Sequence, residues 1–188
     1  MLRAAKGGLG EAMFKVARSH LGRSEMDEAG MWLRRAIVAG DHDAAYQMAI
    51  LFMGKFIEPE PEEDYGDMSV NALAMFQLAA KGGSSAFGGA SFGMYNIGIA
   101  HLYGFARLPR NPDKAATWFE ACGLPEGMMA LKLHRSNMGL ETEADEWDAK
   151  SRRAGFDTVE RSAGRDKVGF ALHHKWPEVR GQKGPPAW

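Results

Sequence analysis

The chain has 188 residues, enough for one ordinary domain or a short repeat array. Hydrophobic residues make up 45% of it, so it can build a core, and its formal net charge of −1 argues against a protein that holds nucleic acid mainly through phosphate contacts. A single cysteine excludes an intramolecular disulfide framework, and no apolar run approaches the roughly 20 residues needed to cross a bilayer.

The first segment, residues 1–24, is basic. Its only acid is Glu11, and its cations are Arg3, Lys6, Lys15, Arg18 and Arg23. This pattern is typical of a mitochondrial transit peptide, so we expect a mitochondrial location, with the cytoplasm as the alternative. The repeats described next favour another interpretation of the same residues, as the first helix of the fold.

Four segments share one spacing of small and large residues. A small residue is followed by a large one at +3, usually another at +4, a small one at +7 and glycine at +11. The small residues are Ala29 and Ala36, Ala72 and Ala79, Ala115 and Cys122, and Ala144 and Ser151. The third copy has Glu126 at +11, with Gly123 and Gly127 on either side.

These offsets fall on one stripe of a helix, at about 100° per residue. We expect the small residues to let another helix approach, the residue at +3 to fill the space between them, and the glycine to end the helix in a left-handed conformation. Met31, Met48 and Met75 are expected in the core as gap-fillers.

A second pattern, with offsets 0, +4, +5 and +8, precedes each of these segments. Its copies are Ala12-Val16-Ala17-His20, Ala44-Met48-Ala49-Phe52, Gly93-Ile97-Gly98-His101 and a more divergent Gly127-Leu131-Lys132-Arg135. We interpret the charges of the last copy as a polar cap on a terminal repeat. The two patterns together predict four helical hairpins, with helices at 10–21, 25–39, 42–54, 67–81, 90–103, 112–122, 125–137 and 141–154.

The stretches "GMYNIGIAH" (93–101) and "NPDKAATWFEACG" (111–123) carry a resemblance to a known family. They resemble the Sel-one-like repeat, a relative of the tetratricopeptide repeat, and the resemblance covers about residues 10–155. It implies an all-α fold, a right-handed α-solenoid of about four helix-turn-helix repeats over residues 1–155. Residues 156–188 match no repeat and are predicted to form an extended C-terminal tail.

Two insertions interrupt the repeats. Residues 55–67, "KFIEPEPEEDYGD", form an acidic loop that is either simply solvated or a docking site for a basic partner. Residues 82–93, "GGSSAFGGASFG", lack a preceding strand and the Gly-Lys-Ser/Thr ending of a phosphate loop. We expect them to form a flexible connector.

The tail contains apolar anchors among glycine, proline and basic residues. These anchors are Val168, Phe170, Leu172, Trp176 and Trp188. The tail either folds back over the solenoid or lies along another protein, and its two tryptophans favour the second, since tryptophan is common among buried interface anchors.

No catalytic constellation is recognisable. Cys122 takes a slot held elsewhere by alanine or serine, and no basic residue adjoins it to lower its pKa. His20 and His101 occupy helix positions where burial is expected, and the chain has no H-E-x-x-H, paired C-x-x-C or G-x-S-x-G. We predict no enzyme, no cofactor and no metal site. Some bacterial members of the resembling family are linked to hydrolase activity, but those chains are rich in cysteine.

Stacked hairpins present an extended surface suited to binding proteins. The first helices are expected to line its concave side, with Lys15, Gln47 and Asn96 as contact residues, together with Phe170, Leu172, Trp176 and Trp188 of the tail. The predicted function is a non-catalytic scaffold, an accessory subunit of a larger complex that could sit at a membrane. Its partners are other protein subunits rather than nucleic acid. The alternative is a soluble adaptor that binds peptides or proteins transiently in signalling or quality control.

Overall fold

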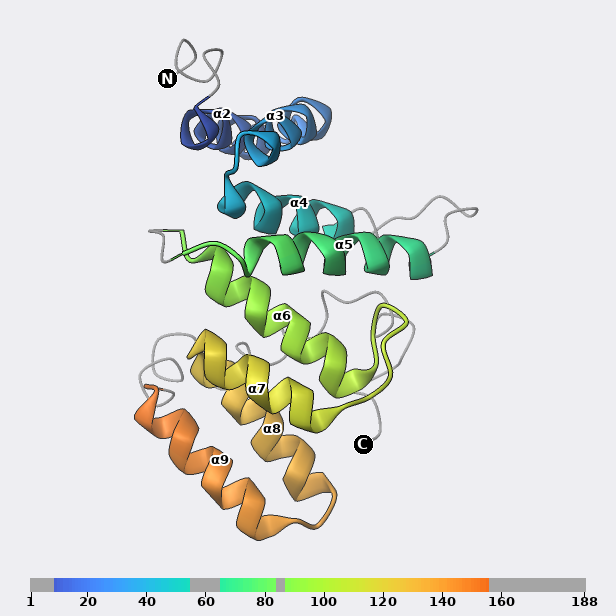
Figure 1. The fold of residues 1–188 in the computed structure, drawn as a ribbon, viewed down its shortest axis with the longest axis vertical. Helices are drawn as coiled ribbons and strands as arrows, with labels where there is room; N and C mark the ends of the chain where they lie inside the picture. The colour runs from blue at the N-terminus through green and yellow to red at the C-terminus, as the bar shows by residue number, and fades with distance from the viewer. Residues whose placement is uncertain (1–8, 55–64, 84–86, 156–188) are drawn as a thin grey trace.

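The computed structural model describes residues 9–54, 65–83 and 87–155, and the regular structure in these ranges is all helical. Figure 1 shows the helices, which are α2 (Gly10–Gly22), α3 (Met26–Val38), α4 (His42–Gly54), α5 (Tyr65–Ala79), α6 (Gly89–Tyr103), α7 (Pro112–Cys122), α8 (Pro125–Asn137) and α9 (Glu141–Arg153). Every predicted helix is present, with each end within two residues of its predicted place. The predicted all-α fold is confirmed.

The helices pair as hairpins in chain order: α2 with α3, α4 with α5, α6 with α7, and α8 with α9. Figure 1 shows these hairpins stacked along the long axis of the molecule, from α2 and α3 at one end to α9 at the other. The second helix of each hairpin contacts the first helix of the next, and α6 also contacts α4 and α8. This stacking of successive hairpins makes a helical solenoid.

The small-residue stripe lies in the core, as predicted. The small side chains at offsets 0 and +7 are between 0% and 7% exposed, and they are Ala29, Ala36, Ala72, Ala79, Ala115, Cys122, Ala144 and Ser151. Small side chains here let the paired helices approach closely, and larger ones would separate them.

In the first three copies the most deeply buried large residue stands at +4, beside the residue expected at +3. Leu33, Phe76 and Phe119 are fully buried, whereas the residues at +3 range from the buried Trp32 to the half-buried Trp118 and Trp147. At 100° per residue, +4 lies about 40° from the first small residue and +3 about 60° on the other side, so the two large residues lie on opposite sides of the small-residue stripe.

Of the three methionines expected in the core, Met48 is buried and Met75 packs against the core from its edge. The expectation for Met31 is wrong, because Met31 is 44% exposed. It stands at +2 in its repeat, which places it about 200° from Ala29, on the outer side of α3.

Glycine ends helices in the predicted left-handed conformation at Gly40 (φ +86°) and Gly155 (φ +96°). In the third copy Gly123 (φ +68°) ends α7, so this helix stops three residues before the expected +11 position. Gly83 does not have positive φ, so the second copy ends differently from the others.

Phe119 joins the third hairpin to the fourth. A Cβ atom built on Gly98 of α6 would lie 2.5 Å from its ring, and one built on Gly127 of α8 would lie 2.4 Å from it. The ring therefore lies against two glycines on different helices. The sequence places glycine at these two points because no side chain fits there.

The buried side chains form two clusters. One is built from α2, α3 and α4, and the other extends from α4 to α8. Four partly buried side chains contact both clusters, and they are Ile37, Phe52, Met75 and Phe87.

Part of the predicted flexible connector is packed structure. The ring of Phe87 meets that of Phe14 edge-on at a centroid distance of 5.1 Å, and the guanidinium of Arg18 lies 5.1 Å from the Phe87 ring centroid. Helix α6 already begins at Gly89, whose N–H donates to Asp43 Oδ1 at 3.1 Å. The connector expectation is therefore wrong for residues 87–93, because Phe87 supplies apolar contacts to both clusters. Residues 84–86 and 55–64 lie outside the described residues.

Candidate functional site

The three contact residues expected on the first helices lie in different environments. Lys15 is exposed on α2 and pairs with Glu11, and Gln47 is half-buried on α4. Asn96 is only 2% exposed, and its Nδ2 donates to the carbonyl of Phe92 at 2.8 Å. In this conformation Asn96 has no surface to offer a partner, so its amide serves α6 itself. Contact with a partner at Lys15 and Gln47 stays a prediction.

The four contact residues expected in the tail, Phe170, Leu172, Trp176 and Trp188, lie outside the described residues. Their role stays a prediction, as does the choice between a tail that folds back and one that lies along another protein.

Cys122 is a core residue of α7. Its thiol donates to the carbonyl of Phe119 at 3.2 Å and accepts from the N–H of Leu124 at 3.4 Å. Burial raises the pKa of Cys122 to about 11, so the thiolate that a nucleophile needs is scarce near neutral pH.

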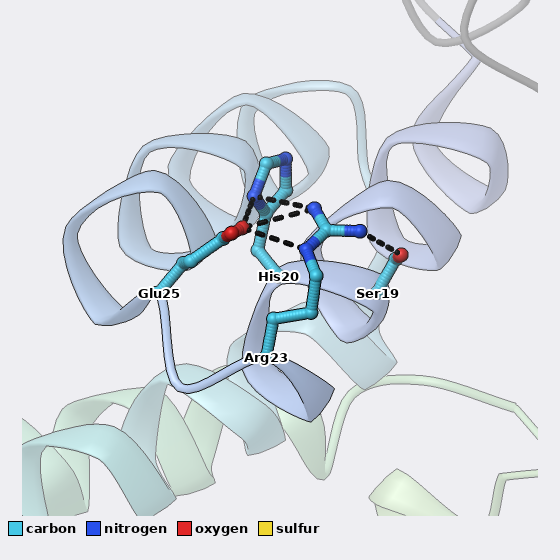
Figure 2. A network of polar contacts seen from close by, with 4 residues as sticks. All are labelled: Ser19, His20, Arg23 and Glu25. Atoms are coloured by element: carbon cyan, nitrogen blue, oxygen red, sulfur yellow. Dashed lines mark hydrogen bonds and ion pairs between the residues drawn. The ribbon is translucent and has the colours of Figure 1, made fainter.

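The histidines expected in the core, His20 and His101, are half-buried rather than enclosed. His20 takes part in a polar network in the turn between α2 and α3 (Figure 2). Its Nδ1 lies 2.6 Å from Glu25 Oε2, and the same carboxylate oxygen accepts from Arg23 Nε at 2.9 Å. The guanidinium of Arg23 also donates to Ser19 Oγ at 3.1 Å.

This network fixes a turn. Ser24 within it has φ +60°, a left-handed conformation that a residue other than glycine adopts at a cost. Two hydrogen bonds lower the pKa of Glu25 below its ordinary value, and the bond from His20 has a larger effect than the bond from Arg23. Since Glu25 and Arg23 are largely exposed, the network contributes little stability.

A pocket of about 220 Å³ lies where the α3–α4 turn meets the end of α5 and the start of α6. It is lined by Gly40, Asp41, His42, Asp43, Gly82, Gly83 and Ala90. Its carboxylates cap backbone groups: Asp41 Oδ1 accepts from the N–H of Ala44 at 2.8 Å, and Asp43 Oδ1 accepts from Gly89. Burial raises the pKa of Asp41. The pocket is smaller than the roughly 300 Å³ at which small-molecule sites begin, and we interpret it as a joint between hairpins.

The last hairpin has the polar character expected of a terminal repeat. Lys132 pairs with Asp148 at 3.3 Å, and Arg135 pairs with Asp113 and Glu143 at 3.2 Å each. These pairs join α8 to α9 and to the start of α7. Within α9 only Ala144 and Ser151 are buried.

Two absences hold for the described part of the chain. It contains no group of three or more His, Cys, Asp or Glu side chains placed to hold a metal ion. None of its helices combines the length and the apolar character that spanning a membrane requires.

Stacked hairpins joined by small-residue stripes define an α-helical repeat solenoid. The model of the Sel1 repeat family matches residues 42–84 and 91–121, which correspond to the hairpins α4–α5 and α6–α7. These two hairpins therefore match Sel1 repeats, as the sequence predicted. Such repeats are generally protein–protein interaction modules. Neither the curated proteins nor the solved structures gave a match to the chain.

Proposed function

We propose that this chain is a non-catalytic scaffold, an accessory subunit of a larger protein complex. The proposal rests on the observation that two polar side chains of the repeats are buried and hydrogen-bonded to the backbone. Cys122 and Asn96 are buried and bonded to backbone groups of their own hairpin, and so are unsuited to reacting with a substrate. What the repeats leave for recognition is the extended surface of the stack.

We further propose a mitochondrial complex, on the basis of the basic first segment. Its cations, which include Arg18 and Arg23, outnumber its single acid, Glu11. Fluorescence microscopy of the tagged chain beside a mitochondrial marker tests this location. A diffuse cytoplasmic signal would contradict it.

The experiment that tests the scaffold function is affinity purification of the chain from its source cells, followed by native size measurement and mass spectrometry. A subunit elutes in a stable assembly far above its own 20.6 kDa, with the same partners in every preparation. A monomer peak with partners seen only after cross-linking supports the transient adaptor instead.

Deleting residues 156–188 tests the role proposed for the tail. We expect the truncated chain to lose its partners while keeping its helix content, measured by circular dichroism, and nearly its melting temperature. A large drop in melting temperature would instead support a tail that folds back onto the solenoid.

A further inference from the structure

Basic side chains gather at one corner of the molecule, where α6 ends, α7 begins and α8 ends. His101 lies in the last turn of α6, Lys114 in the first turn of α7, and His134 and Arg135 in the last turn of α8. Arg110 lies in the loop that joins α6 to α7. We define the basic corner as His101, Arg110, Lys114 and His134.

Backbone contacts hold this corner together. The N–H of Asn111 donates to the carbonyl of His101 at 2.7 Å, and Arg110 Nε donates to the carbonyl of Tyr103 at 3.2 Å. These hydrogen bonds hold the α6–α7 loop against the end of α6 and so fix the position of Arg110.

The charges of the corner act on its imidazoles. Burial, and then the charge of Lys114, lowers the pKa of His101. The pKa of His134 is lowered mainly by burial, and further by the positive charges of Arg135 and Arg110. The ion pair between Arg135 and Asp113 at 3.2 Å brings the end of α8 to the start of α7, next to the end of α6.

Positive charge is left over at this corner. The neighbouring acids Asp113 and Glu143 both pair with Arg135, at 3.2 Å each. Arg110 and Lys114 are exposed, and neither forms an ion pair with the residues that the structure describes. These two cations are available to an anionic group from outside.

Two enclosed nitrogen atoms lie within the same corner. Nδ1 of His101 and Nε2 of His134 are shielded from solvent and have no hydrogen-bond partner among the described residues. Buried polar atoms in folded proteins nearly always have a partner. A carboxylate bound at Arg110 and Lys114 would favour protonation of both imidazoles through its charge, without contact with the enclosed nitrogen atoms.

We propose that the basic corner binds a carboxylate-rich segment of a partner protein. The inference rests on the proposed scaffold function, whose partner it describes by chemistry. A planar guanidinium and an ammonium suit carboxylates, which arginine can hold through two parallel hydrogen bonds. Nucleic acid fits less well, because two available cations on a chain of net charge −1 form too small a phosphate-binding surface.

Binding should strengthen as the pH falls. The positive charges of Lys114, Arg110 and Arg135 lower the pKa of the imidazoles, and a bound carboxylate opposes this effect and raises the pKa of both. The neighbouring acids Asp113 and Glu143 stay paired with Arg135. The protonated imidazoles then bind more tightly, and this gain is lost as the pH rises through the pKa values of the bound state. We expect the affinity to increase as the pH falls from about 7.5 to about 5.5. Glutamate side chains, with a pKa of about 4.3, stay charged over this range.

The test uses the full chain and fluorescein-labelled hexaglutamate, with binding followed by fluorescence anisotropy at low salt. The double variant Arg110→Gln/Lys114→Gln should bind about tenfold more weakly, equivalent to about 1.4 kcal/mol. The matched control Arg34→Gln/Lys81→Gln removes two exposed cations, one from α3 and one from the turn after α5, and its affinity should change by less than about twofold. The variant His101→Gln/His134→Gln should lose the pH dependence.

The proposal would be overturned if the control variant Arg34→Gln/Lys81→Gln weakened hexaglutamate binding as much as Arg110→Gln/Lys114→Gln. It would also be overturned if the chain bound hexaglutamine as tightly as hexaglutamate. Tighter binding of a single-stranded RNA oligomer than of hexaglutamate would replace carboxylate by phosphate as the ligand. Affinity purification separates this inference from the scaffold function. If the variant Arg110→Gln/Lys114→Gln still purifies with its partners, only the proposal for the basic corner is refuted. If the unmodified chain purifies with no partner, the proposed scaffold function is refuted.

Discussion

At the scale of single residues, the two glycines that face Phe119 are the most constrained positions of the stack. Adding a methyl group at Gly98 places carbon 2.5 Å from the fully buried ring of Phe119, so something must shift to admit it. We expect Gly98→Ala to lower the free energy of unfolding by about 1–3 kcal/mol through overpacking, less the gain of up to about 1 kcal/mol from the better helix propensity of alanine. Urea denaturation followed by circular dichroism measures the change.

Gly30 provides a matched control for Gly98. It also lies within a helix, but a Cβ atom there has no neighbour within 4 Å. Gly30→Ala should therefore stabilise the chain by about 0.5–1 kcal/mol. If both substitutions changed stability equally, close contact with Phe119 would not be the cause.

The buried thiol leads to a second prediction at this scale. With its pKa raised to about 11, only about one Cys122 side chain in a thousand is a thiolate at pH 8. We expect the native chain to stay unlabelled by a thiol-reactive disulfide over a period in which the chain in urea reacts completely. Fast labelling of the native chain would contradict the structural role of Cys122.

At the scale of elements, Asn111 starts α7. Its side chain accepts from the N–H of Lys114 at 2.9 Å, and Pro112 follows at the first helical position. Asn111→Ala should cost about 1 kcal/mol of stability, because the first turn loses its cap. Asn71→Ala is the control, since Asn71 is exposed within α5, and there alanine should be neutral or slightly stabilising. Thermal denaturation compares the two, and equal effects would mean that the cap is not what Asn111 contributes.

The helices could be predicted from the sequence because their buried residues repeat with a strict helical period. The stripe from Ala115 to Cys122 is local, so periodicity and the glycine at Gly123 suffice to place α7. The exposure of Met31 and the role of Phe87 could not be predicted in the same way. Phe87 meets Phe14 across more than seventy residues of chain, and such long-range packing leaves no periodic signal.

The candidate site was harder to predict for the same reason. The offset of Asn96 within its helix predicts contact with a partner, yet its burial depends on what packs around α6. The basic corner leaves no signal in the sequence, since His101, Arg110 and His134 come from separate elements and only the stacking of hairpins brings them together.

At the scale of the whole molecule, the two clusters of buried residues predict that stability is not uniform along the stack. In a repeat solenoid each hairpin interacts mainly with its neighbours, so damage at one end need not spread to the other. Leu33 is fully buried in the cluster around α2 and α3, and Leu131 is fully buried in the cluster that reaches α8. Each leucine-to-alanine substitution should cost about 2–5 kcal/mol of local stability.

Hydrogen exchange read by mass spectrometry distinguishes local from global effects of this pair. In Leu33→Ala we expect faster exchange over residues 10–38, with little change over residues 89–153, and the reverse in Leu131→Ala. The side chains that contact both clusters, such as Phe87, should limit how far each loss extends. If either substitution speeded exchange equally along the whole chain, the stack would unfold as one unit. Its two clusters would then be parts of one cooperative core.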